Sequence, residues 1–202
     1  IQGTQWWTSY QPVSYKLDSK LGTEAEFKNM IKQCNAVGVD IIADVVLNQT
    51  TGADVADGKQ TGVAGTEYNG STGDYPGFAT EQYPEGITAS DFHSCSKNIS
   101  NYANQQEVQE CRLSSMWDFD SESEKVQDIQ SDYLAALWNA GVRGFRMDAV
   151  KHIHTDSMKA IKEKFAKKIG VNADSIYWIQ EVIGNSSEAA GIQPSNYVQK
   201  DR

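Results

Sequence analysis

The chain has 202 residues, of which 39% are hydrophobic and 22% are charged. This length suffices for one globular domain with a hydrophobic core or for two small ones, and the composition excludes a mainly disordered chain. No run of about 18 apolar residues is present, so the sequence excludes a membrane-spanning helix. The formal net charge of −9 argues against nucleic acids and anionic membranes as partners, because phosphate binding requires a positive surface.

The first regular element is predicted between residues 24 and 37, where apolar side chains recur on one helical face. Thr23 is a suitable N-cap for this helix, and Gly38 is a suitable stop. Residues 39–47 form a nearly continuous β-branched run, which is typical of a parallel strand buried on both faces. Residues 50–115 are rich in small polar residues without periodicity, and plain loops rarely exceed about 15 residues. We therefore interpret them as an irregular insertion or a small subdomain.

Regular elements resume after this region. Apolar spacing predicts helices at residues 122–140 and 155–169, with strands at residues 142–148 and 176–183. Alternation of helices and strands indicates an α/β domain with a parallel sheet. Three strands do not complete such a sheet, and a (β/α)₈ barrel needs eight, so we expect the sequence to be part of a larger domain.

The chain contains three cysteines, at positions 34, 95 and 111. Cys34 lies on the apolar face of the first predicted helix, so we expect a buried, unpaired thiol. Cys95 and Cys111 flank a polar stretch and could form a disulfide, which would indicate an oxidising compartment. The spacing of the three does not fit a metal site.

Carboxylates gather near the carboxyl ends of the predicted strands, where parallel α/β folds build their active sites. Arg146 and Asp148 lie one pleat apart on the second strand, Glu181 lies near the end of the third, and Asp44 comes from the first. Paired carboxylates at such a place favour acid/base or nucleophilic chemistry. The alternative is an ordinary arginine–aspartate pair beside a solvent-facing glutamate.

The surroundings of the two candidate carboxylates differ in the sequence. Arg146 should favour the ionised form of Asp148, whereas the apolar residues before Glu181 should favour its protonated form. One ionised and one protonated carboxyl is what a retaining glycosidase requires. Trp6, Trp7 and Tyr10 are suited to stacking on sugar rings, although packing in a core is the commoner fate of aromatic residues.

Six segments carry a resemblance to a known family. They are WWTSYQPVSYKL (residues 6–17), DVVLNQ (44–49), DFHSC (91–95), ECRLSSMWD (110–118), GFRMDAVKH (144–152) and QEVI (180–183). With these segments the chain resembles the central part of an α-amylase of the large starch-acting glycoside hydrolase family. It is most similar to the animal-type, chloride-dependent branch and its bacterial relatives. The resemblance implies a partial (β/α)₈ TIM barrel, with residues 1–49 and 116–202 in the catalytic barrel and 50–115 as the B-domain insertion after the third barrel strand.

The resemblance also implies an activity, which is hydrolysis of internal α-1,4-glucosidic bonds in starch, glycogen and maltooligosaccharides with retention. Asp148 would be the nucleophile and Glu181 the general acid and then base, with their carboxyls about 5–5.5 Å apart. Arg146 would hold Asp148 ionised, and Asp44 would be a structural carboxylate nearby. Related enzymes that transfer glucan chains or cleave α-1,6 bonds are an alternative, as is a non-catalytic glucan-binding fragment.

Further binding residues follow from the same resemblance. Glucose subsites before the cleaved bond would use Trp6, Trp7, Tyr10 and Gln11, those after it Lys151 and His152, with Gln49 at the cleavage site. Calcium would be bound by the side chains of Asn48 and Asp118 and by the carbonyls of Gln109 and His152, an all-oxygen set that suits this cation. Arg146 would also contact a chloride. Cys95 and Cys111 would form the B-domain disulfide of a secreted, monomeric enzyme.

Two departures from the family pattern affect these expectations. Gln49 stands where the family has a histidine that contacts the sugar, and its amide can donate a hydrogen bond but cannot be protonated. The family's third catalytic carboxylate and the remaining chloride ligands would come from sequence beyond Arg202. We therefore expect little hydrolysis from these 202 residues alone.

Overall fold

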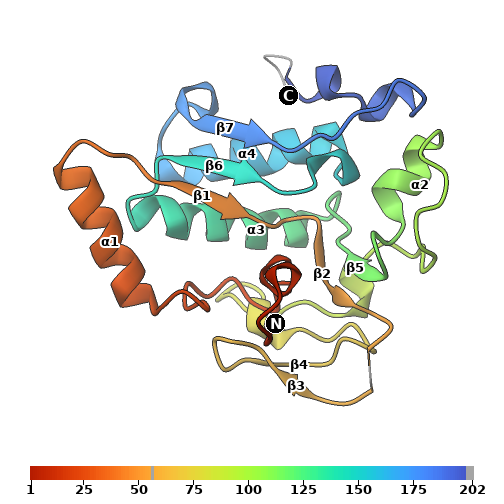
Figure 1. Ribbon diagram of the computed structural model, residues 1–202, viewed down its shortest axis with the longest axis horizontal. Helices are drawn as coiled ribbons and strands as arrows, with labels where there is room; N and C mark the ends of the chain where they lie inside the picture. The colour runs from red at the N-terminus through yellow and green to blue at the C-terminus, as the bar shows by residue number, and fades with distance from the viewer. Residues whose placement is uncertain (56, 199–202) are drawn as a thin grey trace.

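A computed structural model describes residues 1–55 and 57–198 of the chain. Its centre is a three-stranded parallel sheet in the order β1-β6-β7, formed by Ile42–Val45, Gly144–Met147 and Tyr177–Gln180. Helices α3 (Glu124–Asn139) and α4 (Thr155–Ile169) lie together on one face of this sheet (Figure 1). The predicted alternation of helices and parallel strands is thus confirmed, although each strand is shorter than expected.

The remaining elements surround this sheet. The other α-helices and strands are α1 (Glu24–Ala36), α2 (Gln105–Glu110), β2 (Gln49–Gly52), β3 (Gln60–Thr61), β4 (Glu67–Tyr68) and β5 (Met116–Asp118). Short 3₁₀ helices are η1 (Trp6–Tyr10), η2 (Pro76–Phe78), η3 (Ala89–Asp91), η4 (Val150–His152), η5 (Ala173–Ser175), η6 (Ala190–Ile192) and η7 (Pro194–Asn196). No helix among the described residues is both long and apolar enough to span a membrane.

The first helix begins where the sequence predicts and ends one residue earlier than expected, at Ala36. Thr23 forms a capping box with Glu26, and Gly38 adopts a φ of +78° just after the helix. Ile31 is the side chain that α1 buries in the core. The expected burial of Cys34 is wrong, because its thiol lies on a partly exposed side of α1; Cys34 is unpaired, as predicted.

One face of the sheet is open, which corrects the expectation for residues 39–47. Ile42 is 46% exposed, and Tyr177 and Ile179 of β7 are exposed as well. The run is not buried on both faces, because β1 is an edge strand and α3 and α4 cover only one side. The core therefore lies between the sheet and these two helices, where Phe145 and Phe165 are fully buried.

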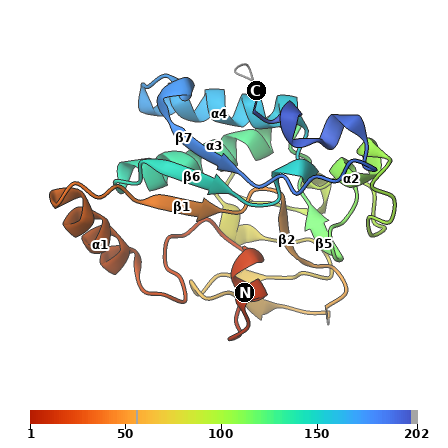
Figure 2. The same ribbon diagram turned by 45° about the horizontal axis from the view of Figure 1, so that its top comes forward.

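Residues 50–115 contain short regular pieces and take part in a second hydrophobic core. Strand β2 pairs antiparallel with β5, and β3 pairs antiparallel with β4. Tyr75, Phe78 and Phe92 form this core with Phe119 and residues of α3. Figure 2 shows these strands on the side of the sheet opposite α4, with η1 close to them. Position 56, in the predicted B domain (50–115), and positions 199–202, in the predicted barrel segment (116–202), lie outside the described residues.

Candidate active site

The register of the parallel sheet brings the predicted acidic residues to one edge. Asp44 of β1 is the partner of Arg146 in β6, and Met147 is the partner of Gln180 in β7. Asp148 and Glu181 each follow their strand by one residue. The backbone N–H of Glu181 donates to the carbonyl of Met147 at 3.0 Å, so the ladder extends beyond the strands. The predicted side chains therefore meet at the carboxyl ends of the strands.

Arg146 joins three carboxylates at this edge. Its Nη1 lies 2.8 Å from Asp44 Oδ1 and 2.9 Å from Asp148 Oδ1, and its Nη2 lies 2.9 Å from Glu181 Oε1. Each carboxylate comes from a different strand or strand end. A single guanidinium thus fixes Asp148 and Glu181 relative to each other through rigid elements, which is the arrangement that catalysis by positioned side chains requires.

A strained turn directly follows Asp148. Ala149 adopts a φ of +50°, in the left-handed region that costs a non-glycine residue about 1–2 kcal/mol. In this conformation its backbone N–H donates to Glu181 Oε2 at 2.9 Å. The turn therefore orients the carboxylate of Glu181 and directly follows Asp148 in the chain.

The electrostatics of the two carboxyls differ from the sequence expectation. Burial raises the pKa of Asp148, although hydrogen bonds from Gln49 and Arg146 oppose this shift. Arg146 therefore lowers the pKa of Asp148, as expected, but the net shift of this pKa is upward because burial outweighs the hydrogen bonds. The expected apolar surroundings of Glu181 are also wrong, because its oxygens contact a guanidinium and a backbone N–H.

Gln49 contacts both Asp148 and the backbone of η1. Its side chain is buried, and Nε2 donates to Asp148 Oδ2 at 3.3 Å and to the carbonyl of Tyr10 at 3.2 Å. Its Oε1 has no hydrogen-bond partner among the described residues. The amide thus links η1 to the candidate nucleophile.

Aromatic side chains border the strand ends. Trp6 is 74% exposed, and its ring meets those of Trp7 and Tyr10 edge-on at centroid distances of 6.1 and 6.0 Å. The hydroxyl of Tyr10 donates to Asp44 at 2.7 Å, which places this group beside the carboxylates. Gln11 follows η1 and is half-buried. Packing in a core does not account for Trp6, so its face is available to a ligand.

A cavity of about 350 Å³ lies beside Glu181 and includes Lys151 and His152 in its lining. Lys151 Nζ pairs with Glu188 at 2.9 Å and lies 4.9 Å from the ring centroid of Tyr102. Sequence reasoning missed Tyr102 and Glu188, because both lie in segments without periodicity and carry no motif of their own. Burial lowers the pKa of His152 to about 4, so its imidazole is neutral near pH 7.

The four residues expected to bind calcium fall into two pairs, Asn48 with Asp118 and Gln109 with His152, each held by local contacts. Asn48 and Asp118 meet where β2 pairs with β5, and both are 2% exposed. His152 Nδ1 donates to the carbonyl of Val108, which precedes Gln109, while the side-chain amide of Gln109 donates to Tyr197. Asp118 Oδ1 and Asn48 Nδ2 have no hydrogen-bond partner among the described residues. A buried carboxylate oxygen without a partner fits a cation ligand.

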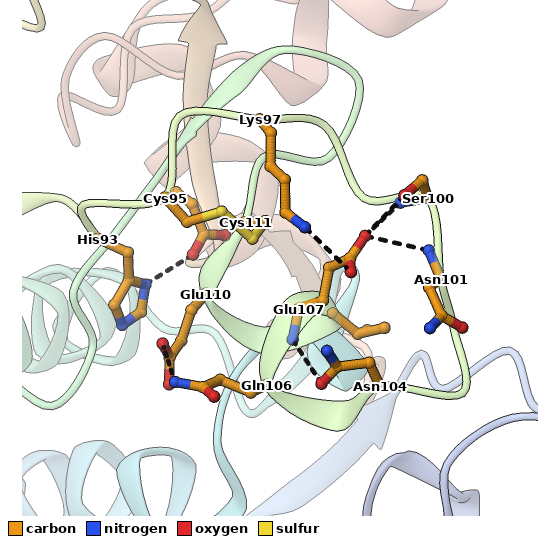
Figure 3. Close-up of a disulfide and its surroundings, with 12 residues drawn as sticks. His93, Cys95, Lys97, Ser100, Asn101, Asn104, Gln106, Glu107, Glu110 and Cys111 are labelled. Carbon is orange, nitrogen blue, oxygen red and sulfur yellow. Dashed lines mark hydrogen bonds and ion pairs between the residues drawn. A yellow bond between two sulfur atoms is a disulfide. The ribbon is translucent and has the colours of Figure 1, made fainter.

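The predicted disulfide between Cys95 and Cys111 is present. It closes the segment that contains α2, as Figure 3 shows. Within that segment Glu107 accepts hydrogen bonds from the backbone N–H groups of Ser100 and Asn101, and Lys97 lies 3.2 Å from its other oxygen. The disulfide therefore supports a loop that is also held by charge-assisted hydrogen bonds.

A second polar cluster was not predicted from the sequence. His93 Nδ1 donates to Asp118 Oδ2 at 2.7 Å, and Glu122 lies within 3.0 Å of both His93 Nε2 and His154 Nε2. Burial lowers the pKa of His93, but the bonds to Asp118 and Glu122 outweigh burial and raise it to about 10. His93 belongs to the DFHSC segment, yet its partners come from distant positions, so spacing gave no signal.

Comparison with known proteins places this geometry in context. Residues 7–189 match the family model described as the alpha amylase catalytic domain. An alpha-amylase of Streptomyces violaceus is 38% identical over 98% of this chain, and one of Pecten maximus is 38% identical over 80% of it. The chain spans only 31% of the length of each of these relatives.

Solved structures give the same result. The wild-type alpha-amylase I of Eisenia fetida superimposes with a TM-score of 0.82 at 35% identity, covering 95% of this chain and 38% of that one. A mutant of the same enzyme, in complex with maltohexaose, is equally similar. These matches support an α/β fold of the TIM-barrel type for the described sheet and helices.

Proposed function

Because the chain belongs to the alpha-amylase catalytic-domain family, we propose that it carries catalytic residues for retaining hydrolysis of internal α-1,4-glucosidic bonds in starch and related glucans. The observation that carries this proposal is the single guanidinium of Arg146 that contacts both Asp148 and Glu181. Two carboxyls held at adjacent strand ends meet the requirement of a double displacement for a fixed nucleophile and a fixed proton donor.

In the first step, Asp148 attacks the anomeric carbon and forms a covalent glycosyl-enzyme, while Glu181 donates its proton to the leaving glycosidic oxygen. In the second step, Glu181 takes a proton from water, and the water cleaves the glycosyl ester with net retention. Arg146 and the hydrogen bond from Gln49 stabilise the carboxylate of Asp148 between turnovers. The N–H of Ala149 keeps Glu181 directed at the cleaved bond.

The glucan chain would run across the strand ends between two groups of side chains. Trp6, Trp7, Tyr10 and Gln11 would contact the sugars before the cleaved bond, and Lys151 and His152 those after it. The exposed ring of Trp6 and the cavity beside Glu181 support this direction. The maltohexaose complex of the Eisenia fetida relative supports an α-glucan as the ligand.

The domain organisation and the ions follow from the same proposal. Residues 1–49 and 116–202 would belong to the catalytic barrel, and 50–115 would form the B domain. Calcium would be held by Asn48, Asp118, Gln109 and His152, where it would neutralise the buried carboxylate of Asp118 and join the two parts. Arg146 alone does not make a chloride site. The Cys95–Cys111 disulfide supports a secreted protein.

The test is the release of reducing sugar from soluble starch by the purified protein that carries this sequence. Glu181→Gln should lower kcat by about 10²–10⁴-fold, because an amide cannot donate the required proton. Glu163→Gln is the matched control, since this exposed glutamate on α4 lies outside the site, and its rate should not change. Equal rates for the two variants would refute the assignment of Glu181.

Product analysis separates the alternatives. Retaining hydrolysis of maltoheptaose gives shorter products whose new reducing ends are initially α-anomers in NMR spectra. Products longer than maltoheptaose would instead indicate a glucan transferase. Binding of maltoheptaose without any cleavage would indicate a non-catalytic glucan-binding protein.

A further inference from the structure

A cluster of metal-ligating side chains lies outside the proposed glucan site, where three segments of the chain meet. His93 comes from the segment before the disulfide, Asp120 and Glu122 follow β5, and His154 precedes α4. Glu110, at the end of α2, lies 3.6 Å from His154. His93 and Glu110 can both be followed beside the disulfide in Figure 3. No step of the proposed hydrolysis uses these residues.

The distances within the cluster are those of a small coordination sphere. Single ligand atoms of His93, Asp120 and Glu122 all lie within 4.8 Å of one another. His93 Nε2 is 2.9 Å from Glu122 Oε2 and 3.8 Å from Asp120 Oδ1. Two ligands on a tetrahedral zinc ion, each about 2.0–2.1 Å from the metal, are about 3.4 Å apart. The two distances from His93 bracket this spacing, and the ligand atoms of Asp120 and Glu122 lie within 4.8 Å of each other, so rotation of these two exposed carboxyl groups would complete the sphere.

Outer contacts orient the ligands, as they do in established metal sites. His93 donates from Nδ1 to Asp118 Oδ2 at 2.7 Å, which directs Nε2 toward Asp120 and Glu122. A carboxylate on the far nitrogen of a metal-binding histidine fixes its tautomer and its direction. The second oxygen of Glu122 lies 3.0 Å from His154 Nε2, so both of these ligands have an outer partner.

We propose that His93, Asp120 and Glu122 bind a divalent transition metal ion of the zinc class, with Asp118 and His154 as outer partners. An imidazole nitrogen with two carboxylates suits Zn²⁺, Co²⁺ or Mn²⁺, whereas Ca²⁺ prefers oxygen ligands alone. Asp120 and Glu122 are 39% and 44% exposed, so the ion has a route from solvent and room for water as a further ligand. This site is separate from the proposed calcium site, which takes the other oxygen of Asp118.

The experiment is a titration of the purified protein with Zn²⁺ by calorimetry, in the presence of saturating Ca²⁺. Calcium excludes zinc from Asn48 and the free oxygen of Asp118, so the remaining binding lies outside the proposed calcium site, and Cys34→Ser in the background removes the one unpaired thiol among the described residues. One zinc ion per chain is expected. Absence of zinc binding under these conditions, or its disappearance as calcium is added, would overturn the proposal.

Variants then assign the ligands. His93→Gln and Glu122→Gln should each weaken zinc binding by more than about 100-fold, and His154→Gln by about 10–100-fold, as for an outer partner. Glu124→Gln is the matched control, because it removes the same charge two residues away on an 83% exposed side chain. Unchanged affinity in both ligand variants would refute the site.

Cobalt gives a readout that needs no variant. Co²⁺ bound to a histidine and two carboxylates in low coordination produces intense visible absorption, which hydrated Co²⁺ lacks. The wild-type protein should show this spectrum with calcium present, and Zn²⁺ should abolish it by displacement. A spectrum like that of hydrated Co²⁺ would contradict the proposal even if a ligand variant fails to fold.

Discussion

Two polar clusters in this molecule have similar contacts but different origins. At the strand ends, Arg146 holds Asp44, Asp148 and Glu181 within 2.9 Å. Near the disulfide, Glu122 lies within 3.0 Å of both His93 and His154. The first cluster is assembled by the register of one parallel sheet, whereas the second is assembled by loops that approach from three segments. Similar ion-pair distances therefore do not imply similar rigidity.

The positive groups also differ in chemistry. A guanidinium stays protonated at any pH at which proteins fold, so the carboxylates around Arg146 have a permanent counter-charge. The imidazoles of His93 and His154 can lose their charge, although their carboxylate partners raise both pKa values, that of His93 to about 10. The strand-end cluster should therefore depend on its one arginine, while the loop cluster should depend on solution conditions.

Removal of that arginine is the most direct way to break the strand-end cluster. Arg146→Met leaves three carboxylates facing one another without their cation. We expect starch hydrolysis to fall by at least about 10²–10³-fold, as for the loss of a preorganised charged donor. Because the Arg146 side chain is 27% exposed, the free energy of unfolding should fall by about 2–3 kcal/mol, less than for a fully buried pair.

Activity assays and urea unfolding measure these two effects. Arg143→Met is the control, because this neighbouring arginine bonds backbone carbonyls and contacts no candidate catalytic carboxylate. Arg146→Lys should recover part of the stability but little of the activity, since one ammonium cannot make three directed contacts. Full activity in Arg146→Met would show that the shared guanidinium is not what positions the two carboxyls.

Removal of the disulfide tests the loop region in the same way. The double variant Cys95→Ser with Cys111→Ser removes a disulfide that joins residues with a sequence separation of 16. In the chain-entropy model this loss lowers the free energy of unfolding by about 3 kcal/mol. Urea unfolding measures the loss, and Cys34→Ser is the control that removes an unpaired thiol. Because the strand-end cluster rests on the sheet, kcat should change little. A loss of kcat as large as that in Arg146→Met would mean that the two regions are not independent.

The strand-end cluster could be predicted from the sequence because its geometry is periodic. Alternation along a strand placed Arg146 and Asp148 on one face, and parallel pairing placed Glu181 beside them. Helix α4 begins and ends as predicted, since its apolar positions repeat at the helical period. The pKa direction of Asp148 could not be predicted, because it depends on how deeply the neighbouring chain buries the carboxyl.

The loop cluster could not be predicted from the sequence, because its geometry is not periodic. His93 and Glu122 are separated by the disulfide segment and by β5, and no repeat relates their positions. The open face of β1 was also missed, since a β-branched run indicates a strand but not whether a second layer covers it. Sequence pattern thus predicts what one element does and leaves contacts between irregular segments undetermined.

Calcium offers a way to sharpen the comparison, because its proposed ligands join the two regions. At a calcium concentration of about 100 times Kd, the wild-type protein should gain about 2.7 kcal/mol of stability, which EGTA should remove. Asp118→Asn should lose most of this gain. Each variant is compared with and without calcium, so the broken contact to His93 cancels. Asp74→Asn, an exposed control in the same region, should respond like the wild type. An equal response in Asp118→Asn would rule out this ligand.

Lys162 on α4 extends the comparison to a cation that forms no ion pair with the part of the chain that the structure describes. Lys162 is only 6% exposed. Its Nζ donates to Gln180 Oε1 at 2.7 Å and lies 5.1 Å from the ring centroid of Trp178. Burial lowers the pKa of Lys162 to about 8, from an ordinary value of 10.5. Lys162 therefore carries a desolvation cost that no carboxylate among the described residues offsets. At the strand ends, by contrast, three carboxylates offset the desolvation cost of Arg146.

This cost should appear as a pH dependence of stability. Between pH 8 and pH 10.5 the unfolded chain keeps the lysine proton while the folded protein has lost it, so the contribution of Lys162 to the free energy of unfolding rises with pH. From pH 8 to pH 9.5 we expect this contribution to rise by about 1.5 kcal/mol, measured as the difference between the wild type and Lys162→Met, because the raised pKa of His93 acts in the opposite direction in both proteins. Lys162→Met should lack the rise, whereas Lys159→Met, on a more exposed part of the same helix, should retain it. Urea unfolding at the two pH values measures the difference, and parallel curves for the wild type and Lys162→Met would mean that the buried ammonium keeps a compensating partner.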